Sequence, residues 1–299
     1  PYSRMAIPYL LHGDIAEKTA GVAALCGATL HGARFALWAP LKTRAKPILW
    51  ILHLSYAWIV VHLVLRMLAA FGYPVARRGS TACVNGGGRL TATAIEVPAD
   101  ISSAAFFMVA ASIAPGSDLT LEEVGVNPTR TGVLDILRLM GADIELINER
   151  LAGGEPVADI RVRHAQLKGI DIPVELVPRA IDEFPVLFIA AANARGVTVL
   201  RGAEELRVKE SDRIQVMADG MQALGIAAEP TADGMRVSGG GYGGGSVASH
   251  ADHRIAMAFA VAALRAGAPI TISDCANVAT SFTGFVELAR TAGLKIKTV

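Results

Sequence analysis

The feature that most constrains the fold is a pattern that the sequence repeats three times from about residue 95 onward. In each copy a strand-like stretch ends in a short polar turn that contains an aspartate, and an alanine-rich helical stretch follows. The three aspartates are Asp100, Asp182 and Asp252, and the helical stretches cover residues 102–107, 184–192 and 255–264. A unit that recurs in this way predicts a domain built from copies of one supersecondary structure.

Each copy continues with the same second half. A β-branched strand follows the first helix, and a polar turn then leads into a second, amphipathic helix. Each second helix is followed by a glycine, which is a C-cap signal, at Gly141, Gly225 and Gly293. The pattern predicts an α/β fold of repeated βαβα units with trailing strands, in which right-handed crossovers produce parallel strands with helices packed on the sheets.

Three related units around one axis would bring several helix N-termini to the same end of the domain. That end would be electropositive and would also contain the three polar turns. The simplest role for each aspartate is to cap the helix that follows it. We expect this role to be sufficient for Asp100 and incomplete for Asp182 and Asp252.

A dense charge cluster lies where the second copy passes from a strand to its second helix. Residues 207–213 contain six polar or charged side chains, in a chain that is only 18% charged. Ser211 or Asp212 is a candidate N-cap for the helix. Unpaired backbone N–H groups at a helix start favour an anion, and neighbouring cations strengthen that preference. The cluster therefore indicates a site for a phosphate or carboxylate, unless it is a solvated helix start with internal ion pairs.

Composition narrows the class of protein. The chain has 299 residues, of which 52% are hydrophobic and 30 are glycine, as in a compact α/β enzyme. A formal charge of +1 gives no support for a nucleic-acid partner. The three cysteines form neither a disulfide framework nor a CxxC metal pair, so we expect no metal and a reducing, cytoplasmic location. The chain opens without a secretory signal and without methionine, which is consistent with a fragment.

An uncharged stretch at residues 48–65 allows a different interpretation. It is just long enough to cross a membrane and has basic residues on both sides. It also contains His53 and His62, and the rest of the chain has the pattern of a soluble domain. We therefore favour a buried or atypical helix over a membrane span.

Five motifs resemble the EPSP synthase family (3-phosphoshikimate 1-carboxyvinyltransferases). They occur in the family's order and spacing, and the resemblance covers about residues 66–299. The motifs are Asp100-Ile101-Ser102-Ser103-Ala104, Asn127-Pro128-Thr129-Arg130-Thr131-Gly132, Ile181-Asp182-Glu183-Phe184-Pro185, residues 204–213, and Asp252-His253-Arg254-Ile255-Ala256-Met257. Residues 279–282 resemble the subtype that includes glyphosate-tolerant enzymes.

The resemblance implies a reaction and an architecture. The family transfers the enolpyruvyl group of phosphoenolpyruvate to the 5-hydroxyl of shikimate 3-phosphate and releases phosphate, without a metal or organic cofactor. Its members have two domains of three βαβαββ units each, with the active site in the cleft. By this comparison, residues 99–299 form a near-complete catalytic domain that lacks its first strand, and residues 1–98 form a partial, divergent second domain. We expect a monomer.

Motif positions imply roles for single residues. Asp182 would be the general base at the 5-hydroxyl, Lys209 would contact that hydroxyl and join in proton transfer, and Glu210 would handle the methylene proton. Arg213 and Arg254 would hold the phosphoenolpyruvate carboxylate. Glu205 would lie near the shikimate side, so the expected substrate-binding residues are Asp182, Glu205, Lys209, Arg213 and Arg254.

Some of these residues also have purely structural interpretations. Glu210 could serve only as an ion-pair partner of Arg213 or Arg207. Asp212 fits a helix cap better than a catalyst. A structural hydrogen bond is the favoured role of His253, and we expect His164 and His250 on the surface.

The departures from the family pattern leave other functions open. The Lys-Ser pair, the arginine-bearing glycine segment and the Ser-Ala-Gln segment that bind substrates in the family have no counterpart here. One alternative is therefore a catalytically impaired remnant, or one half of a split enzyme. A less favoured one is a UDP-N-acetylglucosamine enolpyruvyl transferase, whose catalytic cysteine loop is not matched around Cys26 or Cys83.

Overall fold

The computed structural model describes residues 61, 64, 65, 68, 69, 71–78, 81–92, 96–152 and 155–298. The chain divides into two compact units, Pro1–Val97 and Pro98–Val299. In the first unit, strands β1 (Val75–Arg78) and β2 (Thr81–Val84) form an antiparallel hairpin. The apolar stretch at 48–65 lies almost entirely outside the described residues. Within the described part of the chain, no helix combines the length and the apolar composition needed to cross a bilayer.

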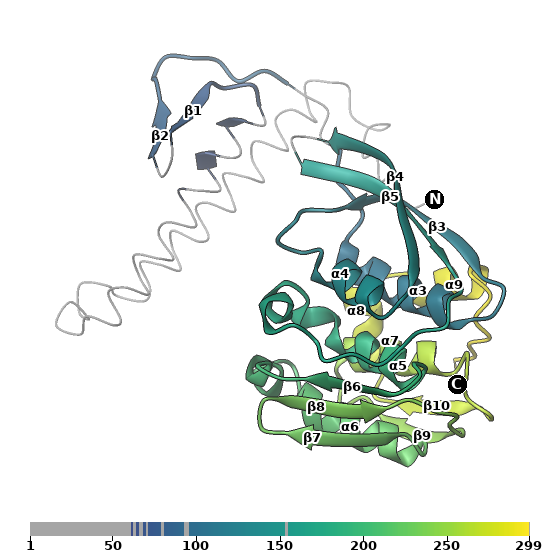
Figure 1. Ribbon diagram of the computed structural model, residues 1–299. Helices are drawn as coiled ribbons and strands as arrows, with labels where there is room; N and C mark the ends of the chain where they lie inside the picture. The colour runs from purple at the N-terminus through teal and green to yellow at the C-terminus, as the bar shows by residue number, and fades with distance from the viewer. Residues whose placement is uncertain are drawn as a thin grey trace. The chain divides into compact units, whose positions relative to one another are not determined.

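The second unit opens with the first repeat (Figure 1). It comprises α3 (Ile101–Ile113), β3 (Asp118–Gly125), α4 (Gly132–Leu139), β4 (Asp143–Ala152) and β5 (Glu155–Arg163). The strands form a sheet of order β3-β5-β4, in which β5 is antiparallel to both neighbours. Because β3 and β4 therefore run in the same direction, α4 connects two parallel strands, as the sequence pattern predicted.

The second repeat has the same order of elements. It comprises η3 (Ile181–Glu183), α5 (Phe184–Ala192), β6 (Val197–Leu200), η4 (Glu204–Val208), α6 (Arg213–Ala223), β7 (Ala227–Thr231) and β8 (Gly234–Ser238). Its sheet order is β6-β8-β7, again with an antiparallel central strand. A six-residue 3-10 helix, η2 (Val174–Arg179), precedes this repeat.

The third repeat contains β9 (Gly245–Ala248), α7 (His253–Ala262), β10 (Ile270–Ser273), α8 (Ala276–Ser281) and α9 (Phe285–Thr291). Strands β9 and β10 pair in parallel across the α7 crossover. Within residues 245–298 no trailing strands follow. The prediction of an α/β fold with repeated units is confirmed, and the third copy is the least complete in the described residues.

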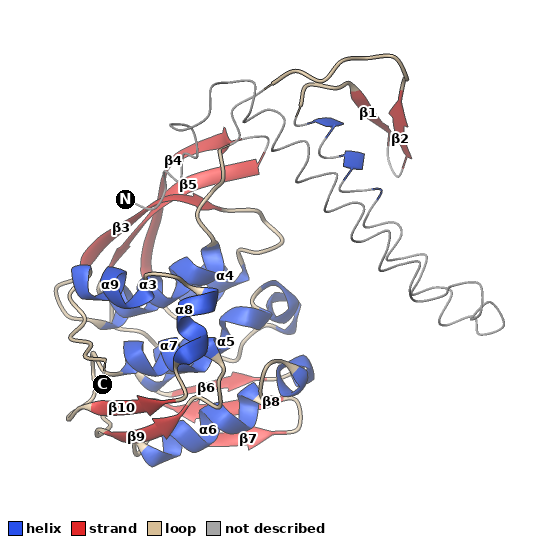
Figure 2. Ribbon diagram, turned by 180° about the vertical axis from the view of Figure 1, so that it is seen from behind, coloured by secondary structure: helices blue, strands red, loops and turns tan. Residues whose placement is uncertain are grey.

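The alanine-rich helices α3, α5 and α7 form the centre of this unit. They lie between the sheet of β3–β5 and the strands of the other two repeats (Figure 2). All nine residues of α5 are buried, and each of the three helices packs against the other two. A helix that is apolar on every side must be enclosed in this way, and small alanine side chains allow close approach.

Local signals fixed the helix ends. Gly141, Gly225 and Gly293 have φ values of 89°, 85° and 99°, which are left-handed conformations that glycine adopts without steric penalty. At the helix starts, Asp100 accepts a hydrogen bond from Ser103 N and Asp252 accepts one from Arg254 N. Asp182 caps nothing, because it lies in the middle of the 3-10 turn η3. The aspartate of the second repeat is therefore free for another role.

A glycine-rich segment at residues 239–245 connects β8 with β9. Its sequence favours a flexible connection, but the structure shows a packed one. Tyr242 is buried and donates its hydroxyl to Ala262 O, and Gly240 N donates to Ala192 O. A Cβ atom at Gly239 would lie 1.8 Å from Ala194 O. Glycine is needed there for close backbone approach rather than for freedom.

Two glycines of this segment form a matched pair for a stability test. We expect Gly239→Ala to lower the free energy of unfolding by about 1–3 kcal/mol, because the new methyl group overlaps a backbone carbonyl that cannot easily move. Gly240→Ala is the control, since its Cβ would meet nothing within 4 Å. Urea unfolding of both variants measures the difference. Equal stabilities would contradict the packed description of the segment.

Candidate active site

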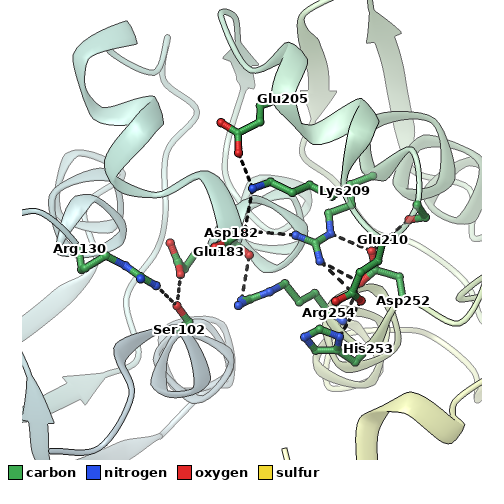
Figure 3. A network of polar contacts seen from close by, with 12 residues as sticks. Ser102, Arg130, Asp182, Glu183, Glu205, Lys209, Glu210, Asp252, His253 and Arg254 are labelled. Carbon is green, nitrogen blue, oxygen red and sulfur yellow. Dashed lines mark hydrogen bonds and ion pairs between the residues drawn. The ribbon is translucent and has the colours of Figure 1, made fainter. Parts of the chain in front are cut away.

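The polar turns of the second and third repeats and the charge cluster meet at the N-terminal ends of the central helices (Figure 3). Asp182 comes from η3, Lys209 and Glu210 come from the turn before α6, and Arg213 is the first residue of α6. Asp252 and Arg254 lie at the start of α7. The four side chains expected to act together, those of Asp182, Lys209, Arg213 and Arg254, are within one network.

Asp182 is the centre of that network. Its Oδ1 atom lies 3.5 Å from Lys209 Nζ and 3.4 Å from Arg213 Nη1, and its backbone carbonyl accepts a hydrogen bond from Arg254 Nη1 at 3.1 Å. Burial raises the pKa of the Asp182 carboxyl, but the charges of Arg254, Lys209 and Arg213 outweigh it and hold the pKa below its ordinary value. The carboxylate is therefore ionised at neutral pH and can accept a proton.

Lys209 bridges two carboxylates. Its Nζ atom donates to Glu205 Oε1 at 2.5 Å and lies near Asp182 on its other side. The hydrogen bond to Glu205 raises the pKa of Lys209 against the opposing effect of burial. The ammonium group is thus charged at neutral pH and is held between Glu205 and Asp182.

Arg213 and Asp252 form a buried ion pair. The Arg213 side chain is 3% exposed and that of Asp252 is 0% exposed, and Nε lies 2.8 Å from Oδ2. Asp252 also caps α7 and accepts a hydrogen bond from Ser211 Oγ at 3.1 Å. The simple capping role is therefore incomplete for Asp252, as expected. Arg213 Nε and Nη2 donate to Asp252, whereas Nη1 donates to Asp182 in the candidate site.

Glu210 is the most open of the predicted catalytic groups. Its side chain is 48% exposed, and Oε2 lies 2.8 Å from His253 Nδ1 and 3.9 Å from Arg213 Nη2. His253 thus makes a hydrogen bond, and its purely structural role stays a prediction. Arg207 pairs instead with Asp212, at 2.6 Å, and Asp212 caps α6 by accepting from Gln215 N.

The donor atoms of Glu210, Asp252 and His253 lie within 4.8 Å of one another. This is the set among the described residues that could hold a metal ion. Asp252 is already neutralised by Arg213, and Glu210 is paired with His253. The expectation of a metal-free site stays a prediction.

A polar cluster beside Asp182, with two buried members and one exposed arginine, was not predicted from the sequence. Glu183 and Ser102 are each 2% exposed, and Ser102 Oγ donates to Glu183 Oε1 at 2.5 Å. Arg130 Nη2 in turn donates to Ser102 Oγ at 2.8 Å. All three residues belong to motifs noted in the sequence, but nothing in those motifs shows that they meet. His164 and His250, by contrast, are exposed as predicted.

A family profile and individual relatives of known name point to the same protein family. A profile of the EPSP synthase family (3-phosphoshikimate 1-carboxyvinyltransferase) matches residues 43–288. Proteins named 3-phosphoshikimate 1-carboxyvinyltransferase from Methylococcus capsulatus and Alkalilimnicola ehrlichii are 68% and 69% identical over 232 residues. Those alignments cover 78% and 77% of this chain but 53% and 52% of the relatives. The chain thus spans about half the length of the curated relatives it matches.

Solved structures agree with the sequence matches. An EPSP synthase from Acinetobacter baumannii is 57% identical with a TM-score of 0.74, over 79% of this chain and 55% of that one. The enolpyruvyl transferase NikO from Streptomyces tendae is 19% identical with a TM-score of 0.58, over 80% of this chain and 53% of that one, which shows only a shared fold. With a family profile that covers most of its length and relatives at this level of identity, the chain belongs to the EPSP synthase family.

Proposed function

We propose that this chain provides the catalytic half of an enolpyruvyl transferase site. The reaction is transfer of the enolpyruvyl group of phosphoenolpyruvate to the 5-hydroxyl of shikimate 3-phosphate, with release of phosphate. The observation that carries the proposal is the convergence of Lys209, Arg213 and Arg254 on Asp182. Proteins 68% and 69% identical to this chain are named for that reaction, which supports the choice of substrates.

The chemistry needs a base and an acid close together. The attacking hydroxyl loses a proton as its oxygen bonds to C2 of the enol, while the C3 methylene gains a proton. Elimination of phosphate then removes a proton from the resulting methyl group. Asp182, ionised by its neighbours, would take the hydroxyl proton with the help of Lys209. Glu210, exposed and adjacent to His253, would serve the methylene carbon.

The arginines would provide the anion-binding part of the site. A guanidinium group binds a carboxylate in bidentate fashion, which suits phosphoenolpyruvate. Arg254 is half-buried and uses Nη1 on a backbone carbonyl, so its other nitrogens remain for a ligand. Arg213 would contribute through Nη1, the atom directed at Asp182. Glu205 would contact the shikimate side through its position beside Lys209.

Phosphate release is the direct test. We expect release when shikimate 3-phosphate and phosphoenolpyruvate are both present and none with UDP-N-acetylglucosamine as acceptor. Release with UDP-N-acetylglucosamine alone would overturn the choice of acceptor. In the absence of turnover, a rise in melting temperature with shikimate 3-phosphate would still report binding, since a ligand that binds the folded state stabilises it by mass action.

A second candidate is one half of a split enzyme, or a catalytically impaired remnant. It is favoured by the observation that the chain spans about half the length of its curated relatives. Under this proposal, residues 1–98 form a partial domain and residues 99–299 a near-complete catalytic domain. The split enzyme would be supported if the chain alone binds substrate without releasing phosphate, and if phosphate release begins when a separately expressed first domain of a relative is added. If the chain binds no substrate and the added domain restores no phosphate release, the remnant is favoured.

Other properties follow as proposals. A formal charge of +1 gives no support for a nucleic-acid partner, whereas the cations around Asp182 support small acidic metabolites. Cys83 and Cys275 are free and exposed, which supports a reducing compartment such as the cytoplasm. We infer a monomer, which sedimentation analysis would check.

Lys209→Ala tests the proposed proton transfer. We expect turnover to fall by about a hundredfold or more, because Asp182 loses the ammonium group that orients its carboxylate and takes part in transfer of the hydroxyl proton. Steady-state phosphate release measures the effect. Lys168→Ala, at an exposed lysine with no ion pair among the described residues, is the matched control and should keep wild-type turnover. Equal rates in the two variants would remove Lys209 from the mechanism.

A further inference from the structure

A cluster formed by the buried Ser102 and Glu183 and the exposed Arg130 joins two repeats directly beside Asp182. Glu183 is the last residue of η3 in the second repeat, whereas Ser102 lies in the first turn of α3 and Arg130 follows β3 in the first repeat. Figure 3 shows Ser102 between the other two side chains. The hydrogen bonds run from Arg130 to Ser102 and from Ser102 to Glu183, at 2.8 and 2.5 Å.

A carboxyl group this deeply buried needs a partner. Glu183 is 2% exposed, and an unpaired carboxylate in such a place would be strongly destabilising. Burial raises the pKa of Glu183, while the Ser102 hydroxyl and the charges of Arg254 and Arg130 act in the opposite direction. Asp182 is the remaining charged neighbour and raises that pKa further. Glu183 is therefore coupled both to the first repeat and to the groups of the candidate site.

The backbone transmits this coupling. Glu183 N donates to Ala180 O at 3.0 Å, which closes the turn that carries Asp182. The carbonyl of Asp182 accepts from Arg254, the cation expected to bind the substrate carboxylate. The hydrogen bond from Ser102 Oγ to Glu183 Oε1 ties this short turn to α3, which η3 also contacts through packing.

We propose that Glu183 is a positioning residue, which holds η3 on the first repeat and thereby fixes Asp182 and Arg254 relative to each other. This role rests on the function proposed above. Glu183 would not touch the substrate. Its effect would pass through the turn, so a glutamine that still accepts from Ser102 should preserve most of it, whereas alanine should not.

Hydrogen exchange tests the anchoring without relying on turnover. In Ser102→Ala and Glu183→Ala we expect amide exchange of residues 181–183 to become about tenfold faster, because a hydrogen bond that holds the turn is lost. Glu183→Gln should stay close to wild type. Asp143→Asn is the control, since the Asp143 side chain is 46% exposed and pairs with Arg163 away from the candidate site. Unchanged exchange in both alanine variants would overturn the proposal.

Turnover tests the consequence for catalysis. Glu183→Ala should lower kcat about 10²-fold, since small misplacements of a catalytic group have effects of that size, and Glu183→Gln should recover most of it. A purely structural role would reduce the amount of folded enzyme and leave kcat per folded molecule unchanged. Faster exchange with unchanged kcat would therefore overturn the positioning role. A wild-type chain without turnover would contradict the proposed function, while the exchange comparison would still decide whether Glu183 anchors the turn.

Discussion

Replacing Asp182 by asparagine is expected to lower turnover by about 10²–10⁴-fold, the range that a positioned general base contributes. Asparagine has nearly the same size and can still accept hydrogen bonds from Lys209 and Arg213, but it cannot take the hydroxyl proton. Because the Asp182 side chain caps no helix, the fold should be retained. Phosphate release at saturating substrates, with circular dichroism of the same samples, measures both effects.

The control for this variant is Asp171→Asn. Asp171 is exposed and lies 3.9 Å from Arg201, so the same chemical change occurs away from the site. Wild-type turnover in Asp171→Asn and loss in Asp182→Asn would support the base. If Asp182→Asn kept full turnover, another group would have to accept the proton.

The pH dependence has a definite sign. The pKa of Asp182 is lowered in the folded chain by its cationic neighbours, which outweigh burial. A group with a lowered pKa contributes stability above its unfolded-state pKa, and that contribution is lost as the pH falls through the folded-state value. We therefore expect wild type to lose stability relative to Asp182→Asn only below the ordinary aspartate range. The acid limb of turnover due to Asp182 should lie there as well.

Arg213→Met should produce the largest loss of stability among these variants. The change leaves Asp252 buried without its cation, and breaking a buried pair from one side is destabilising by about 3–5 kcal/mol. Methionine retains most of the side-chain volume, so the effect is electrostatic rather than a cavity. Urea unfolding gives the free energy, and a low melting temperature should accompany it.

A double-mutant cycle separates the pair from its surroundings. Asp252→Asn removes the acid but keeps a side chain that can still cap α7. Combined with Arg213→Met it removes both charges, and we expect the double variant to be more stable than Arg213→Met alone. Arg161→Met, which breaks an exposed pair with Asp118, is the control and should change stability far less. Strict additivity of the two site variants would show that the pair is not coupled.

The repeated fold was predictable because its signals are local. The glycines after α4, α6 and α9 fix left-handed caps, and the predicted residues 184–192 agree with α5. The site was predictable in part: motifs located Asp182 and Lys209, and the structure brings them within 3.5 Å. Their roles and the domain boundary at residue 98 stay predictions.

Other parts of the site could not be predicted from sequence. An aspartate before a helix favours an N-cap, yet at Asp182 the chain forms a 3-10 turn, and this directs the next residue, Glu183, into the interior. That turn packs against α3, which belongs to another repeat. The partner Ser102 lies 81 residues away, beyond any local pattern.

Asp252 both pairs with Arg213 and caps α7, and this double role limits how the thermal stability of the protein can be raised. Elsewhere, exchanging a buried charge pair for well-fitting apolar side chains is often harmless or beneficial. Here the Asp252 carboxylate also caps the N-terminus of α7 by accepting a hydrogen bond from Arg254 N. An apolar side chain in its place would leave the first turn of α7, which contains Arg254, without its cap. The stability of α7 and the proposed ligand contact of Arg254 therefore depend on the same carboxylate, so stabilising substitutions are better sought at the exposed positions of β3 and β4.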